Sequence, residues 1–182
     1  MRTPVVRRRN ALVLAAISLA VLFVVGALIA AAGVVATGGD DSGPSNGTLE
    51  RPPGLAMPNS ELTPGDVLAA TAQQICVSGY SSRVRDVSTK TKDAVYASYG
   101  ITSHKTGEYE VDHLVPLEVG GSNDVTNLWP EPAAPRPGFH EKDKLEDRLH
   151  ALVCDGKLDL ATAQHDVATD WYAAYVHYVL EK

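Results

Sequence analysis

The sequence predicts an α+β domain that is organised around a two-stranded β-ribbon and the helix that follows it. Residues 109–117 show a period of two, which is typical of a strand whose side chains alternate between two faces. Gly120 and Gly121 mark a turn, and residues 125–129 form a short second strand. After a proline-rich connection, the apolar residues of 139–153 lie on one helical face. The order strand, turn, strand and helix is therefore the centre of the predicted fold.

The N-terminal residues predict a membrane segment ahead of this domain. Residues 1–10 carry four Arg and no acid, whereas residues 11–37 contain no charged residue. That apolar run exceeds the ~20 residues that a transmembrane helix needs, and the Arg residues before it place the N-terminus in the cytoplasm. It is interpreted either as an uncleaved signal-anchor helix or as a cleaved signal peptide, with small residues at 30–32. In both cases the remaining chain is extracytoplasmic, either membrane-anchored or secreted.

A linker and a folded domain follow the membrane segment. Residues 38–59 are rich in Gly, Pro, Ser and Asn and show no periodicity, so they are interpreted as a flexible linker. Residues 60–182 form the predicted domain. Thr63 and Pro64 are typical of a helix N-terminus, as is Ser88 further along. We therefore expect four helices in the domain, at about 64–74, 89–99, 139–153 and 160–180.

The charge of the exported part argues against broad electrostatic attraction to nucleic acid. All 22 acidic residues lie after residue 37, but only 12 of the 16 Lys and Arg residues do, so this part has a net charge of −10 with His neutral. Any nucleic-acid function must then use a local site and a cation. The most basic stretch contains Arg83 and Arg85, which we predict to contact a phosphate backbone. The alternative is that they are solvated surface residues.

The two cysteines, Cys76 and Cys154, both belong to the exported part. In an oxidising compartment such a pair favours a disulfide over two free, buried thiols. The chain-entropy model predicts that closing a loop of this length stabilises the fold by roughly 4–5 kcal/mol. The sequence therefore predicts a Cys76–Cys154 bridge.

The segment "DHLVPLEVGGSNDVTNLWPEP" (112–132) resembles the HNH branch of the ββα-metal, or His-Me finger, endonucleases. That family has Asp-His, a hydrophobic-Pro-Leu run, Gly-Gly-Ser and Asn-Leu in this order. The flanking sequences at 75–101 and 142–171 resemble a bacterial exported subgroup of the same family. The resemblance implies a ββα-metal motif wrapped by flanking helices.

The chemistry of phosphodiester hydrolysis suits the residues of this segment. A neutral His with a pKa near 7 can accept a proton from water, so His113 is the candidate general base. Asp112 is a hard oxygen ligand for a divalent cation. Because neighbours in a strand point to opposite faces, the strand must end or bend here for both residues to flank one phosphate. By resemblance, Asn127 braces the loop that bears the His.

The family also implies a metal ligand on the following helix. His140, at the start of that helix, is the first candidate, and His150 and Glu146 are the alternates. The implied cofactor is one divalent metal ion, with Mg²⁺ ranked first and Mn²⁺, Ca²⁺ and Zn²⁺ as alternatives. The gap between Asn127 and His140 is longer than in compact members of the family, which leaves this ligand open.

These observations predict a metal-dependent endonuclease. Its substrate is nucleic acid, DNA rather than RNA, and low sequence specificity is expected because no element that reads bases is visible. A membrane is the other predicted partner, through residues 11–37 unless they are cleaved, and no protein partner is indicated. The alternative function is a non-enzymatic, envelope-associated binding module with a degenerate HNH fold.

Overall fold

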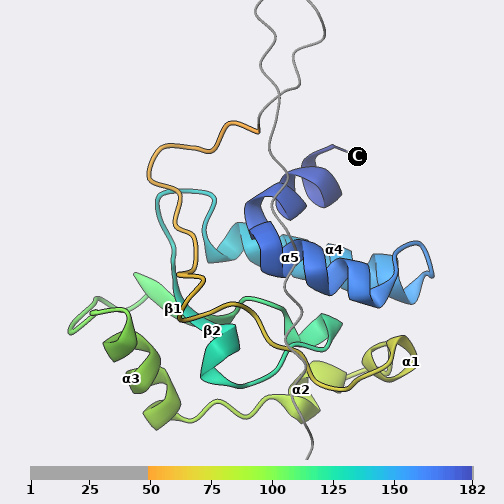
Figure 1. Ribbon diagram of the computed structural model, residues 1–182, viewed down its shortest axis with the longest axis horizontal. Coiled ribbons are helices and arrows are strands. Elements are labelled where there is room, and N and C mark those ends of the chain that lie inside the picture. The colour runs from red at the N-terminus through yellow and green to blue at the C-terminus, as the bar shows by residue number, and fades with distance from the viewer. Residues whose placement is uncertain (1–48, 182) are drawn as a thin grey trace, which may run out of the picture. The chain divides into compact units, whose positions relative to one another are not determined.

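The computed structural model describes residues 49–181, which form an α+β fold (Figure 1). The β-ribbon consists of β1 (Tyr109–His113) and β2 (Leu128–Pro132). No helix within 49–181 is long and apolar enough to cross a membrane. The predicted segments 1–10 and 11–37, and the first part of the linker 38–59, lie outside the described residues. The helices are α1 (Ala72–Ile75), α2 (Tyr80–Val84), α3 (Thr89–Ser98), α4 (Phe139–Cys154), α5 (Leu160–Tyr175) and a closing π-turn, η3 (Val176–Leu180).

The register of the antiparallel ribbon divides its side chains between two faces. Asp112 lies opposite Trp129, and Glu110 lies opposite Glu131. Opposite residues share a face, whereas neighbours along a strand project from opposite faces. These four residues therefore belong to the face that meets α4, where Trp129 packs in the main core. His113 belongs to the other face.

The position of β2 corrects a sequence prediction. The second strand was expected at 125–129, with a proline-rich connection after it, but β2 runs through both Pro130 and Pro132. The N–H of Ala133 donates to the carbonyl of Glu108, and hydrogen-bonded pairs alternate along an antiparallel ladder. The two prolines therefore lie at pairs that need no N–H, which is why the ribbon tolerates them. The first three residues of the predicted strand form a 3₁₀ turn instead.

Helices α4 and α5 enclose the main core against the α4-facing side of the ribbon (Figure 1). Leu145 and Leu149 of α4 are fully buried with Trp129, as the helical pattern of 139–153 predicts. The expected helix at 160–180 is present, but it has two interruptions. Asp170 has an extended backbone inside α5, and the chain closes in the π-turn after Tyr175.

The predicted helix at 64–74 is wrong. Gly65 adopts φ +90°, a left-handed conformation that does not continue a right-handed helix. The side chain of Thr63 does not cap a helix; its hydroxyl lies 2.9 Å from the carbonyl of Leu128 and ties this segment to β2. Only the last turn of the predicted helix forms, as α1, with Thr71 as its N-cap.

The opposite face of the ribbon packs on α3. Ser88 caps this helix and accepts the N–H of Thr91 at 3.1 Å, as the sequence predicts. Val95 of α3 forms a small second core with Val111 and Leu128 of the ribbon. The ribbon is thus held between two packed layers, and its end at His113 lies between them.

Candidate active site at the end of the ribbon

Asp112 and His113 are the last two residues of β1, so the strand ends where the sequence analysis required it to end or bend. Their side chains follow the alternation of the strand. Asp112 faces α4, whereas His113 faces the loop around Asn123 on the other side. Both are buried, with exposed fractions of 9% and 1%. The pair therefore offers two separate functional groups at one end of the ribbon.

Asn123 determines the tautomer of His113. The amide nitrogen of Asn123 donates to the carbonyl of Val84 at 2.7 Å, and its Oδ1 accepts the N–H of Asp86 at 3.1 Å. The same Oδ1 lies 3.2 Å from Nε2 of His113. Because an amide oxygen only accepts hydrogen bonds, His113 must donate from Nε2. In the neutral ring, the lone pair is then on Nδ1.

His113 is held as a neutral imidazole. Burial lowers the pKa of His113, and the positive charges of Arg85 and Lys142 lower it further, whereas the Asn123 hydrogen bond and the charge of Asp112 act in the opposite direction. The net pKa lies below 6.5, so the ring is neutral at pH 7. Its Nδ1 is buried and has no hydrogen-bond partner within the described residues. A lone pair without a partner is the chemical requirement for a base.

Asn127 braces the loop that follows β1. Its Oδ1 accepts the N–H of Val115 at 2.9 Å, and its Nδ2 donates to the carbonyls of Val115 and Ser122, both at 2.9 Å. The side chain is fully buried. These three partners are main-chain groups of the turn, so Asn127 fixes the backbone after His113. The N–H of Asp66 also donates to Oδ1 at 3.3 Å, which ties the turn to a distant segment. The orientation of the imidazole ring itself depends on Asn123.

Lys142 of α4 lies beside Asp112. The sequence predicts a metal ligand from this helix at that place, but the side chain found there is an ammonium group. Its Nζ donates to Oδ2 of Asp112 at 2.7 Å, to the carbonyl of His113 at 2.7 Å and to Oε1 of Glu146 at 2.5 Å. The Lys142 side chain is 0% exposed. An ammonium has three N–H donors, so all of them are satisfied.

The carboxyl groups around Lys142 differ in charge. Burial alone would raise the pKa of Asp112, but the Lys142 charge and hydrogen bond outweigh it and lower that pKa. Burial, together with the charge of Asp112, raises the pKa of Glu146 to about 8 even though the ammonium is adjacent. Glu131 is fully buried, and neither of its oxygens has a hydrogen-bond partner among residues 49–181. Burial raises the pKa of Glu131 well above 4.5. At pH 7, therefore, Asp112 is the ionised partner of Lys142, and the protonated form of Glu146 is favoured.

The three candidate metal ligands of α4 lie at different places. His140 is exposed, and its ring centroid lies 4.3 Å from that of Phe139. Glu146 faces Lys142, and His150 lies near the disulfide. None of the three is hydrogen-bonded to Asp112 in the described part of the chain.

Acidic side chains near Asp112 nevertheless suit a hydrated divalent cation. Partial burial and the charges of Asp112 and Asp143 raise the pKa of Glu110, and burial and Asp112 raise that of Asp143. Carboxylate oxygens are the donors that Mg²⁺ prefers, and Mg²⁺ commonly keeps several waters and uses only one or two carboxylates. Asp112, with Asp143 or His140 of α4, would hold such an ion.

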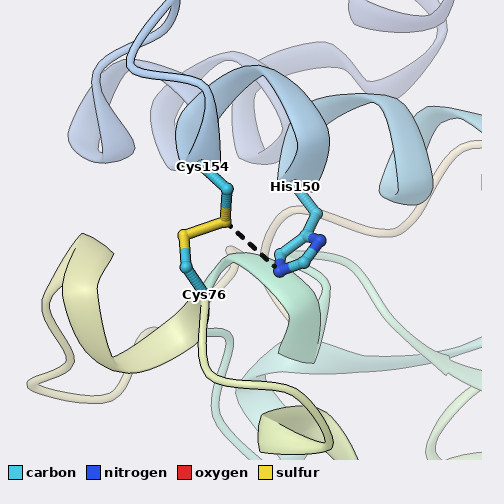
Figure 2. Close-up of side chains that lie close together, drawn as sticks. All are labelled: Cys76, His150 and Cys154. Atoms are coloured by element: carbon cyan, nitrogen blue, oxygen red, sulfur yellow. Dashed lines mark hydrogen bonds between the residues drawn. A yellow bond between two sulfur atoms is a disulfide. The ribbon is translucent and has the colours of Figure 1, made fainter.

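A separate cluster joins His150 to the two cysteines (Figure 2). Its possible ligand atoms lie within 4.8 Å of one another, the one such group within residues 49–181. The predicted disulfide is confirmed, because Cys76 and Cys154 are bonded to each other with a Cα–Cα distance of 5.6 Å. Metal binding by cysteine requires thiolates, and both sulfurs are consumed in this bond. The cluster is therefore a covalent staple between the end of α1 and the end of α4.

The two predicted phosphate contacts differ in their surroundings. The Arg83 guanidinium donates to the carbonyl of Ser78 at 2.8 Å, so it is engaged locally. Arg85 is exposed, and its charge acts on both His113 and Glu110. Arg85 is therefore the better placed of the two to meet a phosphate near His113.

Sequence reasoning missed three residues of this site, namely Asn123, Glu131 and Lys142. The sequence predicts Asn123 as part of the turn between the strands and Glu131 as part of the proline-rich connection, and it indicates no role in the site for either residue. The i, i+4 spacing of Lys142 and Glu146 is a visible signal of a helical ion pair, but it does not indicate that the pair is buried against Asp112.

Comparison of the chain with protein-family models, with curated proteins and with solved structures finds no match in any of the three.

Proposed function

We propose that the exported domain hydrolyses phosphodiester bonds of nucleic acid, as an HNH-type endonuclease with a ββα-metal motif. The observation that carries this proposal is the state of His113. Its Nε2 proton is donated to Asn123, its Nδ1 has no hydrogen-bond partner in the part of the chain that the structure describes, and its pKa is lowered. Such a ring is a prepared general base at the end of a strand, turn, strand and helix arrangement.

Each neighbouring residue has a defined role in this reaction. His113 accepts the proton of the attacking water at Nδ1, and Asn123 keeps that nitrogen unprotonated beforehand. Asn127 holds the loop in place, and Arg85 attracts the phosphate. Asp112, with Asp143 or His140, would hold a divalent cation, for which Mg²⁺ is the first choice. When bound, such a cation stabilises the negative charge that develops on the phosphoryl group and the leaving oxygen.

DNA of low sequence specificity is the proposed substrate. The exported part has a net charge of −10, so binding depends on the cation and on few basic residues such as Arg85. The affinity should therefore be modest and fall with salt concentration.

The test uses the full chain, purified in detergent, with plasmid DNA, single-stranded DNA and RNA in Mg²⁺ or Mn²⁺. His113→Ala should lower the cleavage rate by about 10²–10⁴-fold, the usual contribution of a general base. His165→Ala, which replaces an exposed histidine of α5, is the matched control and should leave the rate unchanged. If the intact chain cuts none of the three substrates at micromolar concentration, the proposal is refuted. If His113→Ala cuts as fast as the intact chain, the assignment of the base is wrong.

A non-enzymatic binding module remains the second candidate, because the Nδ1 of His113 is itself buried. A base needs access to water, and a purely structural His does not. Binding of DNA without cleavage, unchanged by His113→Ala, would favour this second function.

A further inference from the structure

Lys142 places a permanent positive charge against the same carboxylate that is proposed to hold the metal ion. The side chain is 0% exposed and comes from α4, whereas Asp112 comes from β1. The ammonium engages Oδ2 of Asp112, and the Asp112 side chain keeps 12% exposure. Oδ2 of Asp112 is thus held in a buried hydrogen bond with Lys142.

The other two bonds of Lys142 hold the ammonium in place. Nζ also donates to the carbonyl of His113 and to Glu146 on its own helix. Withdrawing the ammonium would leave these buried acceptors without a donor, which is costly in a protein interior. Lys142 is therefore a fixed neighbour of Asp112, and a metal ion does not displace it easily.

We propose that Lys142 is a built-in competitor of the divalent cation for Asp112. It restricts Asp112 to binding through one oxygen, Oδ1, and its charge repels the incoming ion, so the affinity for the ion is low. This inference rests on the proposed function, because it concerns the cation of that same site. Lys142 is a positioning residue here, since it acts through Asp112 and does not touch the substrate.

The type of ion follows from this arrangement. Mg²⁺ and Mn²⁺ tolerate a single carboxylate oxygen because they keep bound water, whereas Ca²⁺ commonly takes both oxygens of a carboxylate. The site is therefore expected to hold a hydrated Mg²⁺ or Mn²⁺ in preference to Ca²⁺, and at low affinity.

The experiment measures Mn²⁺ binding by the full chain in detergent at pH 7, from the electron paramagnetic resonance signal of free Mn²⁺. Lys142→Met keeps the length of the side chain and removes its charge. We expect this variant to bind Mn²⁺ about tenfold more tightly than the unmodified chain once Asp112 is ionised, because it loses a repelling charge and frees Oδ2. Removing Lys142 also lets burial raise the pKa of Asp112, so the affinities are compared at pH 7 and again at pH 8.5. Lys144→Met makes the same charge change on an exposed residue of α4 and should alter the affinity by less than about twofold.

A second pair of variants controls for loss of folding. Lys142→Met leaves buried carboxyl groups unpaired and therefore destabilises the domain. The double variant Lys142→Met/Glu146→Gln removes one of these carboxyl groups, and it is compared with Glu146→Gln alone. The double variant should again bind Mn²⁺ about tenfold more tightly than its single-variant reference. Near-ultraviolet circular dichroism shows which variants are folded.

The outcomes separate this inference from the proposed function. If folded Lys142 variants bind Mn²⁺ no more tightly than their references, Lys142 does not compete for Asp112 and the inference is overturned, whatever the nuclease activity. If they bind it more tightly but the unmodified chain cleaves no nucleic acid, the competition stands and the nuclease function fails.

Discussion

Asn127 is the residue whose replacement should most clearly separate the bracing of the active-site loop from its chemistry. Its side chain makes three hydrogen bonds of 2.9 Å to main-chain groups of Val115 and Ser122, and it is fully buried. Asn127→Ala removes these three bonds and leaves those groups without partners; it also removes a longer, partly exposed bond of 3.3 Å from the N–H of Asp66. An unsatisfied buried polar group costs ~1–3 kcal/mol, so the loss of partners for three such groups should lower the free energy of unfolding by about 3–9 kcal/mol. That is a large share of the roughly 5–15 kcal/mol that stabilises a typical domain.

The assay is urea denaturation followed by fluorescence. Thr126→Ala, at an exposed neighbouring position, is the control and should change the free energy of unfolding by less than about 0.5 kcal/mol. A loss below about 1 kcal/mol for Asn127→Ala, with an unchanged denaturant slope, would refute the reasoning, because water or relaxation of the loop would then satisfy the three groups.

Asn127→Asp tests the two hydrogen bonds that the amide nitrogen of Asn127 donates. The carboxylate can still accept the Val115 N–H, but it cannot donate to the carbonyls of Val115 and Ser122. Burial and these two carbonyls should raise the pKa of the introduced carboxyl above its unfolded value, so the variant loses stability as the pH rises through that pKa. Its deficit relative to the unmodified chain should therefore be larger at pH 8 than at pH 5, and equal deficits would contradict the geometry.

Three further predictions concern the staple, the buried acid and the tautomer. Replacing Cys76 and Cys154 together by Ser opens a link across 78 residues, so urea denaturation should show a loss of about 4.5 kcal/mol, and a loss under ~1 kcal/mol would contradict this. Because the folded pKa of Glu146 is raised from 4.5 to about 8, its contribution to stability is complete below pH 4.5 and is lost as the pH rises toward 8. Glu146→Gln should remove this slope, which is at most about 1.4 kcal/mol per pH unit, and an unaltered slope would assign it to another group. Asn123→Leu should move the His113 proton from Nε2 toward Nδ1, and the ¹⁵N NMR spectrum of the ring should show this change. The same variant should lower kcat for DNA cleavage by about 10²-fold or more. An unchanged spectrum would show that Asn123 does not set the tautomer.

Much of the architecture could be predicted because it depends on local patterns. Ser88 begins α3, the apolar stripe of α4 faces the core, and the two cysteines pair, all as expected. Capping, helical periodicity and cysteine pairing depend on residue types and spacings that are visible in the chain. The helix at 64–74 failed because the Thr-Pro signal was followed by Gly65, whose left-handed backbone breaks the helix.

The sequence by itself determined the α+β class and a strand that contains Asp112 and His113. It predicted that strand over 109–117 and Asn127 within the second strand, whereas β1 ends at His113 and Asn127 lies in a 3₁₀ turn. Only the tertiary structure decided which groups surround that pair. The α4 helix brings Lys142, not His140 or His150, against Asp112, and the turn brings Asn123 against Nε2 of His113. The reason is physical: the rotation of a helix about its axis and the path of a loop depend on packing across the whole core, and no local pattern specifies them. Burial, which sets the charge of Asp112, Glu146 and His113, is likewise a property of the assembled fold.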